Sequence, residues 1–184
     1  MSADSTSFVL PAPCRVQGED VTLRPWDPTD APSLQAIAHD ALMLTWSPLI
    51  RGNEGVDAWI EKRIPWTDHM SWAIVDDADA VLGGISLFQF DTANANAMLG
   101  YWASPAHRGK GVAPQAARLA AGFCFQVLPV QRISLFHAVE NAASCRVEAK
   151  AGFAYEGTTR QSWRYFDGQL HDEHVHSLIR ADLP

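Results

Sequence analysis

The chain has 184 residues, of which 47% are apolar, and its formal net charge at pH 7 is −7. This length and apolar content fit one domain with a sizeable core. The acidic balance excludes nucleic acid as a general partner, because phosphate binding needs a basic surface, and it favours a cationic acceptor such as an amine.

Two further features of the sequence indicate a cytoplasmic protein. The N-terminal residues do not form a basic segment followed by an apolar one, and no apolar run reaches membrane-spanning length, so we expect no membrane partner. The cysteines Cys14, Cys124 and Cys145 show neither metal nor redox spacing, which suits a reducing compartment. We expect residues 1–14 to be a flexible leader and residues 15–184 a single domain.

The first half of the chain predicts a strand and then two helices. Residues 21–25 alternate in polarity and indicate the strand. A second helix is expected from about Glu54 to the proline at position 65, after an aromatic loop over residues 44–48. The first helix precedes that loop, and its expected buried stripe consists of Leu34, Ile37, Ala38 and Leu42.

The second half predicts antiparallel strands followed by a helix. Residues 71–75 pair with 81–90 in a hairpin, and residues 97–103 form the next strand before a long apolar helix. The later elements are a strand over 132–139, a short helix over 141–151 and closing strands over 153–160 and 171–180. This order is typical of an α+β fold and not of a doubly wound one.

Residues 104–113 join the strand over 97–103 to the apolar helix and indicate an anion-binding turn. Glycines allow a tight turn and close approach of a ligand, and the first N–H groups of the helix point toward it. Pro114 rules out the dinucleotide fingerprint, and Gly111 stands where a P-loop needs Ser or Thr. A flexible strand-to-helix turn without a ligand is the alternative.

The motifs in this half resemble those of the GNAT N-acetyltransferase superfamily. Arg108-Gly109-Lys110-Gly111-Val112-Ala113 is similar to the family loop that binds the coenzyme A pyrophosphate. Leu99-Gly100-Tyr101-Trp102, Asn141 to Val147 and Lys150 to Phe153 resemble motifs of the ribosomal-protein N-terminal acetyltransferases. The resemblance implies a mixed, mostly antiparallel central sheet flanked by helices, with strands splayed around an acyl-CoA site.

The resemblance also implies roles for individual residues. Ser144 is expected to protonate the departing thiolate, and Asn141 to bind the pantetheine amides. Main-chain N–H groups of the strand over 97–103 are expected to bind the acyl oxygen. The full set that the resemblance implies in acetyl-CoA binding is Leu99, Tyr101, Trp102, Ala103, Arg108, Gly109, Lys110, Gly111, Val112, Ala113, Asn141, Ser144 and Arg146.

A general base is less well defined. Related sequences carry a glutamate at the position of Met98, so the candidates here are Asp91, Glu140 and His137. Without a strong carboxylate base, an acceptor with a low amine pKa is favoured, since an α-amine is roughly a tenth deprotonated at pH 7 and a lysine amine far less. For the acceptor pocket we expect Trp46, Met98 and Phe88.

The sequence therefore favours an N-acyltransferase that moves an acetyl group from acetyl-CoA to a primary amine in a ternary complex. The acceptor is a protein or peptide N-terminus or a small amine, and the protein a monomer or homodimer. A non-catalytic acyl-CoA-binding sensor and a transferase of another acyl group, such as succinyl, are the alternatives.

Three histidines near the C-terminus resemble a metal-binding pattern. On a strand, His174 and His176 share one face while His171 lies on the other. That arrangement fits an ordinary closing strand, so we expect no metal cofactor.

Overall fold

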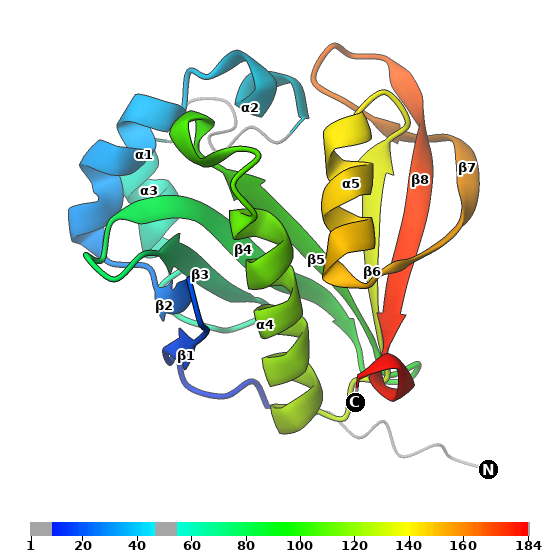
Figure 1. Ribbon diagram of the computed structural model, residues 1–184, viewed down its shortest axis with the longest axis horizontal. Coiled ribbons are helices and arrows are strands. Elements are labelled where there is room, and N and C mark those ends of the chain that lie inside the picture. The colour runs from blue at the N-terminus through cyan, green and yellow to red at the C-terminus, as the bar shows by residue number, and fades with distance from the viewer. Residues whose placement is uncertain (1–8, 47–54, 184) are drawn as a thin grey trace.

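A computed structural model describes residues 9–46 and 55–183. Within them, eight strands form one sheet in the order β1-β2-β3-β4-β5-β6-β8-β7. All neighbouring pairs are antiparallel except β5 and β6 (Figure 1). The strands are β1 (Val16–Gln17), β2 (Thr22–Pro25), β3 (Met70–Val75), β4 (Val81–Asp91), β5 (Asn96–Ala103), β6 (Arg132–Ala138), β7 (Ala154–Arg164) and β8 (Leu170–Ile179).

Helices cover both faces of the sheet. In Figure 1, α4 (Val112–Val127) and α5 (Ala142–Ala151) lie in front of it, and α2 (Ala41–Trp46) lies above the space between them. The helices α1 (Ala31–Ile37) and α3 (Val56–Glu61) pack together with Trp26 and Trp59 in a second core. None of the described helices is long and apolar enough to cross a bilayer.

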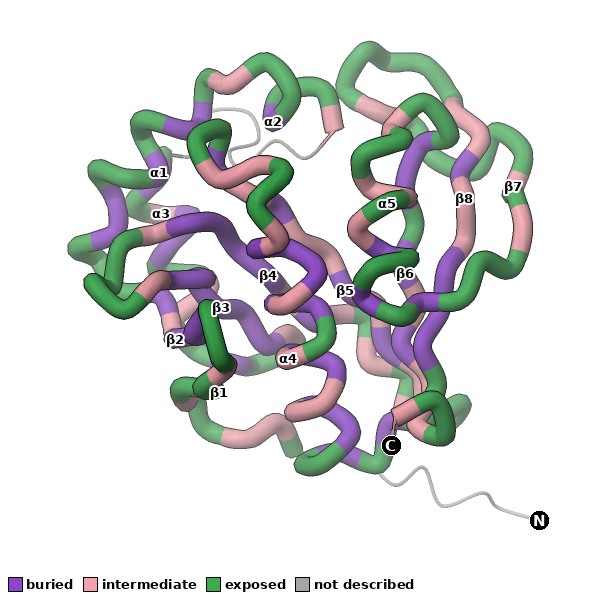
Figure 2. The backbone as a smooth tube through the Cα atoms, in the orientation of Figure 1, coloured by how far each residue is buried: buried purple, intermediate pink, exposed green. Residues whose placement is uncertain are grey.

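The two cores follow from alternation along the central strands. In β3, Trp72 and Ile74 belong to the core beneath α4, whereas Ala73 and Val75 belong to the core beneath α1 and α3. Side chains of successive strand residues point to opposite faces, so a strand covered on both sides is apolar throughout. Figure 2 shows the resulting buried band through the middle of the sheet.

The parallel pairing of β5 with β6 is short, and the space for the candidate site opens where the pairing ends. The register pairs Asn96 with Arg132, Ala97 with Ile133 and Met98 with Ser134, and it ends there. Both strands continue, β5 as far as Ala103 and β6 as far as Ala138. The sheet therefore splays between these two strands from Leu99 onward, as the fold expectation requires.

Most expected elements are confirmed, with corrections near the N-terminus. The short strand β1 was not expected, and Leu42 is not part of a buried stripe because α1 ends at Ile37 and Leu42 is half exposed on α2. Trp46 ends α2 and does not lie in a loop. The expected start of the next helix, Glu54, lies outside the described residues.

The predicted leader is only partly described. Residues 1–8 lie outside the described residues. Leu10 and Cys14 pack against the main core, and the Cys14 carbonyl accepts a hydrogen bond from Trp72 Nε1 at 3.0 Å.

Candidate active site

A cavity of about 350 Å³ occupies the space between the diverging strands. Its walls come from the end of β5, the end of β6, the start of α4, the start of α5 and α2. A site of this size, with mixed apolar and polar lining, is typical of small-molecule and cofactor binding.

The turn that the sequence analysis proposed for anion binding lies at the start of α4. Gly109 and Gly111 have φ of 76° and 85°, in the left-handed region that glycine adopts without a Cβ penalty. Gly111 is the N-cap and offers no side-chain cap to the first helical N–H groups, which have no acceptor within the helix. Because Val112 and Ala113 line the cavity together with both glycines, these N–H groups and the positive end of the helix dipole lie at its wall.

The two cations of this turn differ in position. Arg108 lines the cavity and forms an ion pair with Asp40, the residue before α2. This hydrogen bond holds the pKa of Asp40 below its usual range. Lys110 is exposed and is not among the lining residues. Asp40 was not expected from the sequence, because no local pattern connects it to Arg108.

A buried hydrogen-bonded chain connects β5 to α5. Tyr101 Oη and Ser144 Oγ are 2.7 Å apart, and Ser144 Oγ donates to Glu148 Oε1 at 3.2 Å. Burial raises the pKa of Glu148 to about 8, and it also raises the pKa of Tyr101. Tyr101 and Ser144 line the cavity, whereas Glu148 is fully buried behind them.

The sequence assigned no catalytic role to Glu148, the buried member of this hydrogen-bonded group, because related sequences carry the corresponding glutamate one position later. It lies four positions after Ser144, and residues at that spacing share one face of a helix. The spacing was therefore visible in the sequence. What could not be seen was that this face of α5 turns toward Tyr101 and not toward solvent.

Two other α5 residues meet the cavity. Asn141 is the N-cap of the helix, and its side chain accepts a hydrogen bond from the Ser144 N–H at 3.3 Å. Arg146 lines the cavity from the exposed side. Both residues belong to the set that the resemblance implies in acetyl-CoA binding.

The splayed edge of β5 carries main-chain donors. Ser104 N–H donates to Leu82 O of the strand β4 at 2.8 Å. Since donor direction alternates along a strand, the N–H groups of Tyr101 and Ala103 point to the opposite side, where β6 has diverged. Leu99 and Trp102 also line the cavity, although the Trp102 ring stacks on Trp26 in the second core, with centroids 6.2 Å apart.

The two carboxylates considered as bases do not line the cavity. Asp91 pairs with Asn96 at the beginning of β5, the end remote from the turn before α4, and it accepts hydrogen bonds from Asn94 that lower its pKa. Glu140 is exposed and contacts His171 Nδ1 at 3.3 Å. Of the three candidates, only His137 lines the cavity.

Of the three residues expected in the acceptor pocket, one lines the cavity and two do not. Met98 and Phe88 pair across β4 and β5 before the splay begins, and neither lines the cavity. Trp46 does line it. Its ring packs edge-on against the rings of Tyr165 and His171, with centroids 5.7 Å and 6.3 Å apart. The aromatic side of the cavity thus joins α2 to the hairpin of β7 and β8.

A splayed parallel strand pair with a helix N-terminus at one end of the cavity is the arrangement that the resemblance to acyl-CoA-dependent acyltransferases implies. The comparisons with known proteins agree. Residues 20–154 match the model of the acetyltransferase (GNAT) domain. The chain belongs to this family, and it is an N-acetyltransferase.

Particular relatives cover nearly the whole chain. The Bacillus subtilis protein YdaF, provisionally named a ribosomal N-acetyltransferase, is 30% identical over 179 residues, which are 92% of this chain and 96% of that protein. Mycobacterium smegmatis RimJ in complex with CoA-disulfide has a TM-score of 0.79 at 24% identity over 89% of this chain and 84% of its own. The microcin C7 self-immunity acetyltransferase MccE, in complex with acetyl-CoA and AMP, gives 0.76 at 18% identity, covering 88% and 93%.

Gly111→Ala tests the turn before α4. A Cβ there has open space, with Gln115 Nε2 at 3.6 Å, but φ of 85° is strained for alanine, so the N–H groups of the first turn are expected to reorient. We expect acetyl-CoA affinity, measured by calorimetry, to fall about tenfold or more through lost charge-assisted hydrogen bonds.

Gly168→Ala is the matched control. Gly168 has φ of 78°, lies in the turn between β7 and β8 and also has open space around the added Cβ. Both variants should lose about 1–2 kcal/mol of stability, and only Gly111→Ala should lose acetyl-CoA affinity. Equal affinity in the two variants would exclude the turn from the binding site.

Proposed function

We propose that this enzyme acetylates the α-amino group at the N-terminus of a protein or peptide, by direct attack of the amine on the thioester of acetyl-CoA in a ternary complex. Three features support the proposal: the composition of the cavity lining, the aromatic side of the cavity, and the hydrogen-bonded chain at Ser144.

The composition of the cavity lining favours an acceptor amine with a low pKa. Among the residues that the structure describes, no carboxylate lines the cavity. An α-amine has a pKa of about 7.7–8.0 and is roughly a tenth deprotonated at pH 7, whereas a lysine amine, with a pKa of about 10.4, is deprotonated in about one molecule in a few thousand. An enzyme without an adjacent carboxylate base is suited to the α-amine. This is the observation that carries the proposal.

The aromatic side supports a peptide acceptor. Trp46 of α2 and Tyr165, which follows β7, contact each other at the wall of the cavity. Aromatic side chains provide a rigid contact surface with a polar tip at low entropic cost. The name of YdaF, which refers to ribosomal acetylation, agrees with an acceptor of this class.

The chemistry needs one polarised carbonyl and one proton donor. As the amine nitrogen bonds to the carbonyl carbon, the oxygen gains negative charge, which the N–H groups of Tyr101 and Ala103 are positioned to stabilise. When the carbon–sulfur bond breaks, Ser144 gives its hydroxyl proton to the thiolate and regains one through Tyr101 or Glu148. The proton of the amine leaves to solvent.

An acceptor screen tests this function. Peptides that contain one lysine are presented in two forms, with a free N-terminus and with a blocked one, and CoA release and product mass are measured. We expect acetylation of the free α-amine, with the blocked peptides at least about a hundredfold slower, because the two deprotonated fractions differ by that order.

Efficient acetylation of blocked peptides at lysine would contradict the α-amine proposal. Turnover of aminoglycosides or polyamines with no peptide turnover would assign the site to a small amine. Binding of acetyl-CoA with no CoA release across the whole panel would contradict catalysis in the ternary complex.

Ser144→Ala tests the proton donor. We expect kcat to fall about a hundredfold or more with little change in the KM for acetyl-CoA, since the hydroxyl acts on the leaving group and not on cofactor binding. Tyr101→Phe keeps the Ser144–Glu148 contact and should lower kcat less. A large loss for Tyr101→Phe together with a normal rate for Ser144→Ala would move the donor role to the tyrosine.

A further inference from the structure

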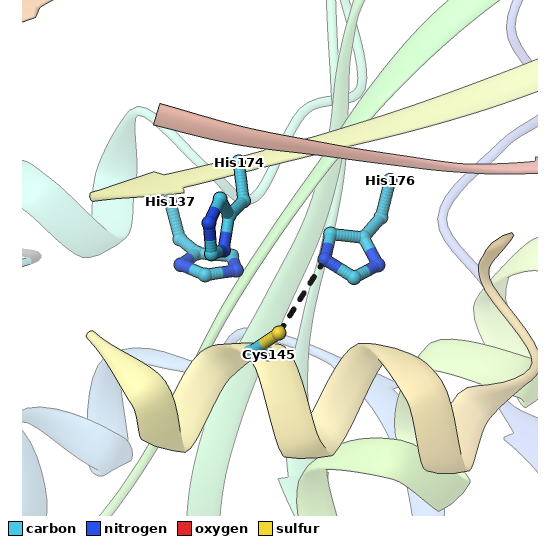
Figure 3. A group of neighbouring side chains, drawn as sticks. All are labelled: His137, Cys145, His174 and His176. Carbon is cyan, nitrogen blue, oxygen red and sulfur yellow. Dashed lines mark hydrogen bonds between the residues drawn. The ribbon is translucent and has the colours of Figure 1, made fainter. Parts of the chain in front are cut away.

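Four side chains outside the proposed reaction converge beside α5. His137 comes from β6, His174 and His176 come from β8, and Cys145 comes from α5. One nitrogen or sulfur atom of each lies within 4.8 Å of the corresponding atoms of the others. Figure 3 shows the three imidazole rings on the strands facing the sulfur on the helix.

The cluster contains buried polar atoms without partners. His137 and His176 are only 4% and 2% exposed. Within the described part of the chain, His137 Nε2 and His174 Nδ1 have no hydrogen-bond partner. Such atoms cost free energy unless something binds them, so the cluster in its present form is incomplete.

The ring orientations suit metal ligation. His137 Nδ1 lies 2.8 Å from the Ala138 carbonyl, which fixes the proton on that nitrogen and leaves the Nε2 lone pair directed at the cluster. A metal-binding histidine commonly uses its other ring nitrogen in this way. On His176, Nε2 lies 3.7 Å from Cys145 Sγ.

The separations match a tetrahedral ion of ordinary size. Bonds of about 2.0–2.1 Å to nitrogen and about 2.3 Å to sulfur place tetrahedral ligands roughly 3.3–3.6 Å apart. The distance from Cys145 Sγ to His176 Nε2 is already close to this value. The four candidate ligand atoms all lie within 4.8 Å of one another, so adjustment of their side-chain torsions would bring them to these separations.

We propose that His137, Cys145, His174 and His176 form a structural Zn²⁺ site with one thiolate and three imidazole ligands. Three nitrogens and one soft sulfur are a zinc donor set, and four protein ligands close the coordination sphere. On binding, the Cys145 sulfur exchanges its proton for the metal, and the proton goes to solvent. Glu148 Oε2 lies beside the cluster, at 3.4 Å from His176 Nε2 and 3.6 Å from His137 Nε2.

The site would fasten α5 to the sheet. Cys145 directly follows Ser144, and its ligand partners belong to β6 and β8. A metal bridge between these elements would fix the helix that carries the Ser144 hydroxyl. The inference does not depend on the acceptor of the acetyl group, and its test does not use activity.

The test uses the full chain without an affinity tag. Zinc content is measured after purification with supplemented Zn²⁺, and the chelated protein is titrated with Co²⁺, whose tetrahedral thiolate complexes show intense visible bands and a sulfur-to-metal charge-transfer band. We expect one zinc per chain, saturation at one Co²⁺ per chain, and a melting temperature that rises by several degrees with Zn²⁺.

Matched variants locate the site. Cys145→Ser should remove the charge-transfer band, and His174→Ala should weaken Co²⁺ binding more than about tenfold because one of four ligands is lost. Cys14→Ser and His171→Ala, the latter on the opposite face of the same strand, should leave the spectrum unchanged. A wild-type protein with no stoichiometric metal, or a spectrum that persists in both ligand variants, would overturn the proposal, and neither result would affect the acetyl-transfer assays.

Discussion

The structure depends on the early end of pairing between β5 and β6. The two parallel strands share only three register pairs, the last between Met98 and Ser134. If they continued side by side, the edge of β5 would be saturated by main-chain hydrogen bonds and the sheet would close over the cavity. Because they diverge, the same segment supplies an open wall and outward-facing N–H groups.

Both helices that flank the divergence begin at the cavity. The start of α4 contributes glycines in the left-handed region and unpaired first-turn N–H groups, which suit an anion. The start of α5 contributes Asn141 and Ser144, a capping residue and a hydroxyl. In the proposed reaction, α4 would bind the cofactor and α5 would carry the proton donor, with β5 between them.

The α5 helix has a second connection that the acetyl-transfer chemistry does not use. Ser144 contacts Tyr101 on one side, while Cys145, one step around the helix, contacts His176 on the other. Glu148 lies between the two groups, within hydrogen-bond distance of Ser144 Oγ and close to His137 and His176. The position of the Ser144 hydroxyl therefore depends on all the contacts that hold α5 against the sheet.

The sequence predicted features that depend on neighbouring residues and missed contacts between residues far apart in the chain. Alternation along residues 71–75 and the Gly109–Gly111 turn are local signals, so the strands and the turn were found. The placement of Asp91 depends on which end of β5 meets α4, and that is a matter of register. The contacts of Cys145 with His176 and of Arg108 with Asp40 join elements far apart in the chain, so no spacing rule could indicate them.

The central claim is that one continuous site runs from the start of α4 along the open edge of β5. A crystal structure of the enzyme with acetyl-CoA tests it most directly. The account predicts the diphosphate on the N–H groups of residues 109–113 and the thioester between β5 and β6, with its carbonyl oxygen facing Tyr101 or Ala103. Acetyl-CoA bound elsewhere, or with its diphosphate away from the start of α4, would contradict it.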